Sequence, residues 1–204
     1  MMVVDMKQEE LELILEKHKK WLNVDCDVMK ADLCYVDLRD ANLSNANLRD
    51  ADLRYADLRY ADLSNANLSY ADLCYADLHN ADLCYVNLNG AKNVPFIPYA
   101  CPESGSFIAY KKAREYIVEL KILDDAKRLS ATSRKCRCNK AKVLRILNFD
   151  RTTADITEVK SNYDSKFIYK VGDIVSVDNF DEDRWNECST GIHFFINFQE
   201  AVDY

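Results

Sequence analysis

Thirteen consecutive copies of a five-residue unit fill residues 26–90, from CDVMK and ADLCY at the start to ADLCY and VNLNG at the end. On an α-helix, five residues turn through about 500°, so the leucine of each copy would lie about 140° from the last and form no apolar stripe. In a flat strand, successive copies would point their leucines to opposite faces. The chain must therefore bend after each unit, so that every Ala and Leu pair faces a common axis.

This run of A(D/N)LxX units resembles the pentapeptide-repeat family, whose fold is a right-handed quadrilateral β-helix. The resemblance implies four units in each coil of twenty residues, with successive coils stacked as parallel β-bridges about 4.7–4.9 Å apart. Small Ala beside branched Leu would fill the narrow lumen without voids. Thirteen units then predict a short solenoid of about three and a quarter coils, with a rise of roughly 15 Å.

With a coil of twenty residues, side chains twenty apart should stack in columns on the outer surface. Two columns are acidic, one is aromatic and one is cationic, and we take them as candidate protein-binding residues. They are Asp32, Asp52 and Asp72; Asp37, Asp57 and Asp77; Tyr35, Tyr55 and Tyr75; and Arg39 and Arg59, which His79 continues.

The repeats carry most of the negative charge of the chain. Residues 26–90 hold eleven Asp and five Lys or Arg, a net charge of −6, and the whole chain has −7. An acidic regular rod can imitate nucleic-acid phosphates, and relatives of the quinolone-resistance type are thought to mimic duplex DNA towards DNA gyrase. Alternatively, Asp and Asn are the residues that the bend tolerates, because their side chains bond nearby backbone N–H groups. The tyrosines, likewise, are either stacking residues or a ligand platform.

The ends of the rod define the domains. Residues 7–22 have a helical composition with apolar residues at three- and four-residue spacing, and we expect this helix to cover the first coil, with Asp5 as its N-cap and His18 as a packing residue. Residues 93–105 hold all three prolines and form the boundary. The predicted domains are 1–25, a capping helix; 26–95, the β-helix; and 96–204, a C-terminal β-rich domain.

The C-terminal domain is predicted to be small and α+β or mostly β. Strand patterns cover residues 106–113, 116–123, 135–147, 153–159 and 167–177, and residues 191–204 read as a strand running into a short helix. The stretches CPESGSFIAYKK, RKCRCNKAKV and DRWNECSTGIHFF resemble an uncharacterised domain that follows pentapeptide repeats in phage and bacterial proteins. That resemblance carries no assigned activity, but it implies a phage or prophage origin.

Two clusters in this domain could carry chemistry. Four thiolates would suit tetrahedral zinc, and the four candidates are Cys101, Cys136, Cys138 and Cys188; however, no C-x-x-C is present, so reduced buried cysteines are the alternative. Residues 127–145 hold eight Lys or Arg and no acid, which favours either a phosphate or nucleic-acid site or a solvated face. The candidate ligand-binding residues there are Arg134, Lys135 and Arg137.

The tail GIHFFINFQEAVDY resembles the G-I-Y-F…A-x-x-Y segment of ADP-ribosyltransferases, whose two tyrosines sandwich nicotinamide. His193 would replace the first tyrosine and Tyr204 would match the second. The catalytic Glu of that family has no counterpart before the sequence ends, so the resemblance implies nucleotide binding without turnover.

The sequence shows no signal peptide core, no transmembrane run and no familiar catalytic motif, and its eight cysteines are irregularly spaced. We therefore expect a cytosolic, non-enzymatic interaction protein without a cofactor. If it is phage-encoded, it would bind and inhibit a host nucleic-acid-handling or defence protein, with homo-oligomerisation left open. The alternative is a nucleotide- or ADP-ribose-binding C-terminal domain displayed on an inert solenoid.

Overall fold

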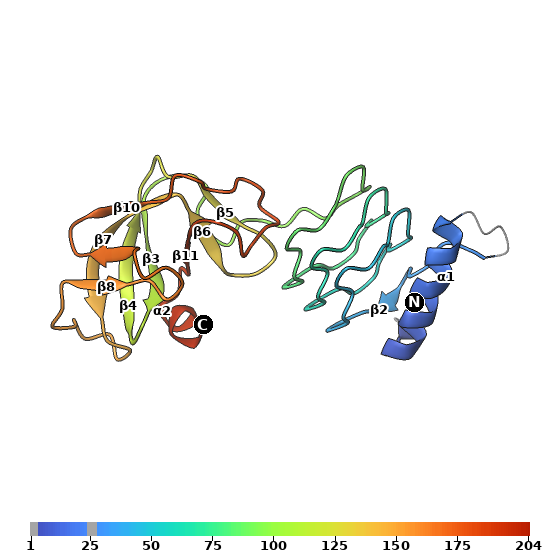
Figure 1. Ribbon diagram of the computed structural model, residues 1–204, viewed down its shortest axis with the longest axis horizontal. Coiled ribbons are helices and arrows are strands. Elements are labelled where there is room, and N and C mark those ends of the chain that lie inside the picture. Colours follow the sequence, from blue (N-terminus) through green and yellow to red (C-terminus); the bar gives the residue numbers. More distant parts are fainter. Residues whose placement is uncertain (1–3, 24–27) are drawn as a thin grey trace. The chain divides into compact units, whose positions relative to one another are not determined.

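The computed structural model describes residues 4–23 and 28–204, so the first repeat begins outside the described residues. The chain divides into two compact units, Met1–Pro98 and Tyr99–Tyr204. Figure 1 shows the repeats as a series of similar coils and the C-terminal unit as a group of short strands. The two units are described separately below.

Parallel β-bridges join repeat residues that lie twenty positions apart. Asp32 pairs with Asp52, Asp52 with Asp72, and Asp72 with Lys92. The Leu33 N–H donates to the Asp52 carbonyl at 2.8 Å, and the Asp52 N–H donates to the Ala31 carbonyl at 3.0 Å. The prediction of twenty-residue coils stacked through parallel bridges is therefore confirmed, and residues 31–92 form a solenoid.

The repeat leucines line the interior of this solenoid. From Leu33 to Leu83 each of them is at most 2% exposed, as predicted from the five-residue spacing. Leu88, in the last repeat, is half-buried. The lumen is thus a continuous column of leucine packed with alanine.

The fifth residue of each repeat from residue 31 on has a left-handed backbone, which the sequence pattern did not indicate. Its φ lies between 58° and 63° from Tyr35 to Tyr85. Asn, Asp and Gly tolerate this conformation well, but tyrosine rarely adopts it. Gly90 has φ 69°, and a Cβ there would lie 2.6 Å from the ring of Tyr70, so any other residue would displace that ring.

Two elements cover the N-terminal edge of the solenoid. Strand β1 (Val4–Asp5) pairs in parallel with β2 (Val36–Asp37). Helix α1 (Gln8–Leu22) buries Leu11 and His18. The predicted N-cap is wrong: Asp5 lies in β1, and the residue before the helix is Lys7, whose side chain makes no capping bond. The helix instead begins with a favourable charge pattern, acidic in its first turn and basic in its last.

The C-terminal unit contains three antiparallel sheets and one short helix. The largest has the order β10-β7-β4-β3, the second β11-β6-β5, and the third β8-β9. Tyr110 of β3 also bridges to Phe195, which joins the edges of the first two sheets. The bounds are β3 Phe107–Ala113, β4 Tyr116–Ile122, β5 Arg128–Ser130, β6 Cys136–Cys138, β7 Lys140–Leu147, β8 Glu158–Lys160, β9 Ile168–Lys170, β10 Ile174–Ser176, β11 Ile192–Phe194 and α2 Phe198–Asp203.

Several predicted strands are shorter or divided. The stretch 135–147 breaks at Asn139 into β6 and β7, which belong to different sheets. The stretch 167–177 breaks into β9 and β10, with Gly172 between them. Only the end of 153–159 is strand, in β8. The two long strands β3 and β4, and the final strand followed by a helix, agree with the prediction.

The core of this unit lies between the first two sheets. It includes Leu120 and Ile122 of β4, Val143 of β7, and Phe194 of β11. A smaller cluster beneath α2 contains Ile117, Leu147, Phe195, Phe198 and Ala201.

Candidate functional site

The second residue of every repeat from 31 to 90 is an Asp or Asn whose side chain holds the bend. In all twelve repeats its Oδ1 accepts the backbone N–H two residues later, at 2.9–3.3 Å. Since the Asn side chain accepts this hydrogen bond as well as the Asp side chain does, the bond requires an acceptor oxygen but not a negative charge. The aspartates are therefore structural residues whatever else they do.

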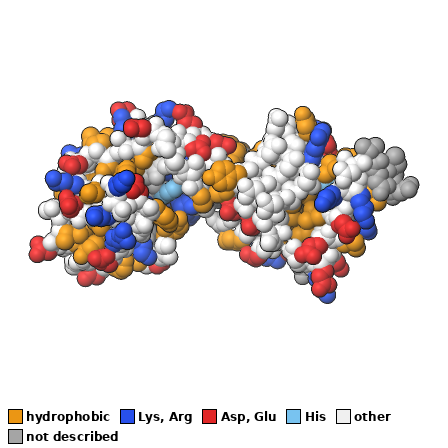
Figure 2. Space-filling view, viewed as in Figure 1, with side chains coloured by type: hydrophobic (Ala, Val, Ile, Leu, Met, Phe, Trp, Pro, Cys, Tyr) orange, Lys and Arg blue, Asp and Glu red, His pale blue; other side chains and the backbone are white. Residues whose placement is uncertain are grey.

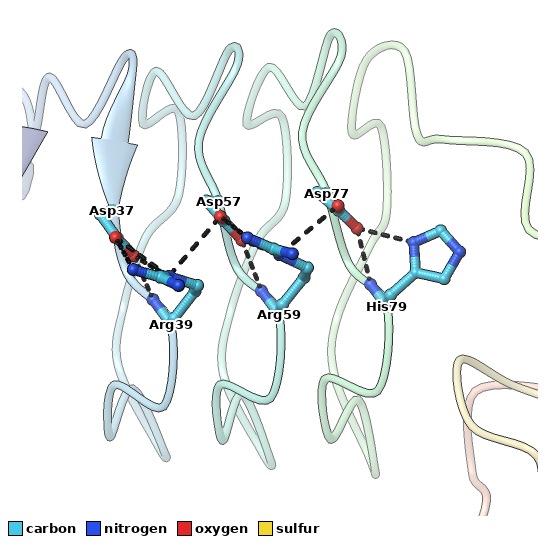
Figure 3. Close-up of polar contacts among 6 residues, drawn as sticks. All are labelled: Asp37, Arg39, Asp57, Arg59, Asp77 and His79. Atoms are coloured by element: carbon cyan, nitrogen blue, oxygen red, sulfur yellow. Dashed lines mark hydrogen bonds and ion pairs between the residues drawn. The ribbon is translucent and has the colours of Figure 1, made fainter. Parts of the chain in front are cut away.

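We call residues 36–40, 56–60 and 76–80 the arginine stack, because its cations alternate with carboxylates along the solenoid (Figure 3). Arg39 pairs with Asp37 at 2.6 Å and reaches Asp57 at 3.8 Å. Arg59 pairs with Asp57 at 2.5 Å and reaches Asp77 at 3.7 Å. His79 Nδ1 lies 2.7 Å from Asp77.

These contacts change the electrostatic character of the predicted acidic column. Hydrogen bonds from Arg39 and Arg59 hold the pKa values of Asp37 and Asp57 below the usual range. Each carboxylate of the column has a cation or an imidazole beside it. The arginine stack thus presents alternating charge, whereas a phosphate mimic would need a run of free negative charge.

We call residues 31–35, 51–55 and 71–75 the tyrosine stack. The rings of Tyr35 and Tyr55 lie 4.6 Å apart and nearly parallel, and those of Tyr55 and Tyr75 lie 4.9 Å apart. Tyr75 is 73% exposed. Beside the rings, Arg54 forms a bidentate pair with Asp52. This arrangement fixes three stacked rings in a row, in which neighbouring rings cover each other's inner faces.

An open groove of about 560 Å³ borders the tyrosine stack. Its lining combines two aromatic side chains, those of Trp21 and Tyr70, with charges of both signs. The charged residues are Lys30, Asp50, Asp52, Arg54, Asp72 and Lys92. Asp52, Arg54 and Asp72 belong to the repeats that carry Tyr55 and Tyr75, so the groove adjoins the tyrosine stack along these repeats, although the stacked rings themselves do not line it.

The four candidate cysteines of the C-terminal domain do not come together as a set of metal ligands in the described residues. Within residues 4–23 and 28–204, the one group of three potential ligands close enough for a metal is Asp32, Cys34 and Asp52. Burial, with Asp52 nearby, raises the pKa of Cys34, which disfavours the thiolate that a metal requires. Cys101, Cys136 and Cys138 are buried as free thiols, and Cys188 is exposed.

The basic stretch 127–145 is largely paired within the chain. Arg134 bonds Glu200, Lys140 bonds Asp125 at 2.7 Å, and Arg145 bonds Glu119 at 2.9 Å. Lys127 contacts Glu182. Figure 2 shows acidic and basic side chains interspersed over the visible face of this unit. The structure therefore places no one-sign cationic surface there.

The other candidate ligand-binding residues of this stretch are turned inward. Arg137 is 2% exposed, and its guanidinium donates to the carbonyls of Asp181, Thr190 and Asp183. Lys135 lies 3.8 Å from Glu187 and 3.5 Å from the sulfur of Cys188. Both side chains hold the loop 181–190 against the sheet.

His193 and Tyr204 line one small cavity, together with Lys111, Asn162 and Tyr163. Its volume is about 40 Å³, whereas pockets for small-molecule ligands span roughly 300–1,000 Å³. His193 Nε2 lies 3.1 Å from the Glu187 carbonyl, and burial lowers its pKa to about 4. The cavity as it stands has room for water but none for a nicotinamide ring.

Lys111 is the residue of this cavity that the sequence analysis missed. It is 7% exposed, and burial lowers its pKa to about 8. Ala109 and Ala113, on the same face of β3, are fully buried. The two-residue period of the strand was the signal that this lysine points inward.

Two protein families match the chain. Residues 97–201 match a family of unknown function (DUF5758), and residues 26–65 and 61–92 match pentapeptide repeats. The first match covers 105 of the 204 residues, so the chain belongs to that family, with pentapeptide repeats preceding the family domain.

Three solved pentapeptide-repeat proteins are similar to the chain in part. One, from the Arabidopsis thaliana thylakoid lumen, is 33% identical in sequence, with a TM-score of 0.31. The match covers 32% of this chain and 46% of the Arabidopsis chain, so this chain spans about half the length of that protein. A second, from Nostoc PCC 7120, is 28% identical with a TM-score of 0.29, and the match covers 45% of this chain and 78% of the Nostoc chain. HetL, involved in heterocyst differentiation regulation in Nostoc sp. strain PCC 7120, is 38% identical with a TM-score of 0.19, and the match covers 32% of this chain and 35% of HetL.

No curated protein matches the chain. Of the helices in the described parts of the chain, none has the length and apolar character needed to cross a bilayer.

Proposed function

We propose that this chain is a non-catalytic interaction protein that binds a partner protein through its tyrosine stack. We also propose that residues 31–92 form a right-handed quadrilateral β-helix, since four five-residue segments separate each pair of bridged residues. Such a scaffold holds side chains at fixed spacing without loops. Binding on a scaffold of this kind requires little ordering of the surface.

The observation that carries the proposal is the stacked column Tyr35–Tyr55–Tyr75, in which Tyr55 and Tyr75 are exposed and Tyr35 is half-buried. Tyrosine is enriched at binding surfaces because it offers a large, rigid contact area and a polar tip at low entropic cost. The bidentate pair of Arg54 and Asp52 beside it supplies hydrogen-bonding groups in a fixed orientation. The adjoining groove offers a recess for a side chain of the partner.

A host protein that handles nucleic acid or defends the cell is the partner class that the resemblance to phage proteins favours. The alternating charge of the arginine stack favours recognition by shape and aromatic contact over imitation of a phosphate backbone. Binding should then depend only weakly on salt, because buried rings are not screened by ions.

The test is photocrosslinking from defined positions of the full-length protein. A photoreactive phenylalanine analogue would replace Tyr75 in one version and Tyr60 or Tyr85 in the matched controls. The control tyrosines are each 60% exposed and occupy the same fifth position of other repeats. We expect one protein to crosslink from position 75 and not from positions 60 or 85.

A second version of the experiment removes the column. Changing Tyr35, Tyr55 and Tyr75 together to Asn keeps a residue that tolerates the left-handed backbone, so the coils should stay folded. Capture of the partner should be lost in this triple variant and kept in Tyr60→Asn. Equal capture by both variants, or crosslinking only from the C-terminal unit, would contradict the proposal.

A further inference from the structure

Lys111 of β3 places a positive charge inside the C-terminal unit without a counter-charge from the chain. The side chain is 7% exposed, and it takes part in no ion pair within residues 4–23 and 28–204. Burial lowers its pKa only to about 8, so most of the ammonium stays protonated at pH 7. Because buried charges in proteins are normally paired, an unpaired ammonium at this depth indicates a negative partner from outside the chain.

The Lys111 ammonium borders the small cavity of the C-terminal unit. In the part of the chain that the structure describes, two polar side-chain atoms are sealed from solvent and have no partner, His18 Nε2 and Glu200 Oε2. Lys111 Nζ is not one of these sealed atoms, although it has no ion-pair partner, so it keeps contact with accessible space. The cavity of about 40 Å³ that Lys111 lines provides that space.

The surroundings of the cavity hold more positive than negative charge. Lys135 is a second buried lysine, 9% exposed, and its ammonium lies 5.6 Å from the centre of the Tyr204 ring, which lines the cavity. Glu187 lies 3.8 Å from Lys135 and offsets one of the two charges. Burial, Lys111 and Lys135 together lower the pKa of His193 to about 4, so this cavity residue is neutral at pH 7 and the lysines supply the charge.

The mouth of the cavity carries hydrogen-bond donors. Asn162 Oδ1 already accepts the Arg114 N–H at 2.5 Å, which leaves the amide N–H groups of Asn162 as its donors. Tyr163 and Tyr204 bring hydroxyl groups to the same lining. An ammonium, amide N–H groups and hydroxyls are the groups that bind anions in proteins.

The size of the cavity limits the anion to a very small one. A cavity needs roughly 10–15 Å³ to hold one water molecule, so a volume of about 40 Å³ admits a water-sized ligand and excludes nucleotides and sugar acids. A halide ion is only slightly larger than water. The cavity therefore fits a single-atom anion.

We propose that this cavity binds one small monovalent anion, such as chloride, between the Lys111 ammonium and the donors at its mouth. The bound anion offsets the cost of burying Lys111, and it links β3 to the β8–β9 loop and to the C-terminal tyrosine. The site lies entirely within the C-terminal unit, so the proposal does not rest on the proposed partner binding.

The test is urea unfolding of the full-length protein at pH 7 in sodium chloride and in sodium gluconate of equal ionic strength. Trp185 fluorescence in a Trp21→Phe background reports the C-terminal unit, and gluconate is too large for the cavity. A ligand that binds only the folded state stabilises it by an amount that grows with the logarithm of its concentration once the site is nearly full. We expect the unfolding midpoint to rise in this way with chloride and not with gluconate.

Matched lysine variants separate the site from general salt effects. Lys111→Met should abolish the difference between chloride and gluconate, whereas Lys142→Met, at an exposed position of β7, should keep it. Equal midpoints in the two salts for the parent protein would overturn the proposal. An undiminished chloride effect in Lys111→Met would overturn it as well.

A direct observation does not depend on any variant. Crystals of the full-length protein grown in sodium bromide, with diffraction data collected at the bromine absorption edge, should show an anomalous peak beside Lys111 Nζ. A water molecule or an empty cavity at that position, without an anomalous peak, would contradict the proposal.

Discussion

The Nδ1 atom of His18 accepts the backbone N–H of Ala31 at 2.9 Å, and so replaces a bond that each later repeat makes within the chain. In those repeats the first residue donates to the leucine carbonyl three positions earlier, as Ala41 does to Leu38 at 3.1 Å. Ala31 follows no such leucine, and helix α1 supplies the acceptor instead. His18 therefore couples the helix to the first coil, a role beyond the packing that the sequence indicated.

We expect His18→Phe to lower the free energy of unfolding of the β-helix by about 1–3 kcal/mol, because the buried Ala31 N–H then has no acceptor. Urea titration followed by Trp21 fluorescence measures this in a Trp185→Phe background, which leaves a single tryptophan. Lys17→Ala, on the exposed side of α1, should change the stability by less than about 0.5 kcal/mol. Equal unfolding midpoints for His18→Phe and its parent would show that the bond contributes nothing.

Acid should destabilise the C-terminal unit through His193. Burial lowers the pKa of His193 from 6.5 to about 4, so the unfolded chain binds the proton first as the pH falls. The contribution of His193 to stability is therefore fully present above pH 6.5 and is lost as the pH falls from about 6.5 to 4. His193→Gln should flatten this part of a stability–pH curve recorded by Trp185 fluorescence in a Trp21→Phe background. An unchanged slope would place the acid sensitivity in other groups.

The left-handed fifth position should be selective for residue type. Tyr60 has φ 63° and is 60% exposed, so its replacement tests the backbone with little change in packing. Tyr60→Asn should be neutral or stabilising, whereas Tyr60→Val should cost about 1–3 kcal/mol because a β-branched side chain clashes in this conformation. Thermal unfolding of the two variants checks the order. Equal stabilities would mean that the coil relaxes to another conformation at this position.

The arginine stack separates the structural role of aspartate from its charge. Changing Asp37, Asp57 and Asp77 to Asn keeps the acceptor for the backbone N–H two residues later and removes only the ion pairs, which are weak at exposed positions. We expect this triple variant to stay folded and to bind the partner as before, whereas the triple Ala variant should unfold at lower urea. If the triple Asn variant stayed folded but lost partner binding, the charge of these aspartates would be needed for binding, as phosphate mimicry requires.

The parts of the fold that follow from local spacing were predictable. The five-residue period placed the leucines inside and the tyrosines in columns. The break at Asn139 also has a signal that the strand assignment overlooked: Cys136 and Cys138 face inward at even positions, whereas Ala141 and Val143 face inward at odd ones. A strand cannot make that one-residue shift without an irregularity.

The pairing of the basic stretch was not predictable in the same way. Arg137 bonds carbonyls 44 to 53 residues away, and Arg134 bonds Glu200, 66 residues away. Such contacts depend on how loops fold back onto a sheet, which no local period encodes. The left-handed tyrosines were also missed, because the intrinsic preference of tyrosine is for extended backbone.

The buried Lys111 should lower the stability of the C-terminal unit at every pH at which its ammonium is charged. Its pKa falls from 10.5 to about 8 in the folded protein. Below pH 8 both states are protonated and the fold carries the full cost. Between pH 8 and about 10.5 the unfolded chain binds more protons, so stability rises with pH. The shift corresponds to about 3 kcal/mol.

Lys111→Met should therefore stabilise the C-terminal unit at pH 7 and lose its advantage as the pH rises to 10.5. The raised pKa values of Cys138 and Tyr169, both due to burial, act with the opposite sign in this range, but they are present in both proteins. The difference between the two urea-stability curves thus reports the lysine together with its electrostatic coupling to Cys138. Lys142→Met, at an exposed position of β7, should give a flat difference. A Lys111→Met protein that is less stable at pH 7 would show that the ammonium makes a favourable contact inside the cavity.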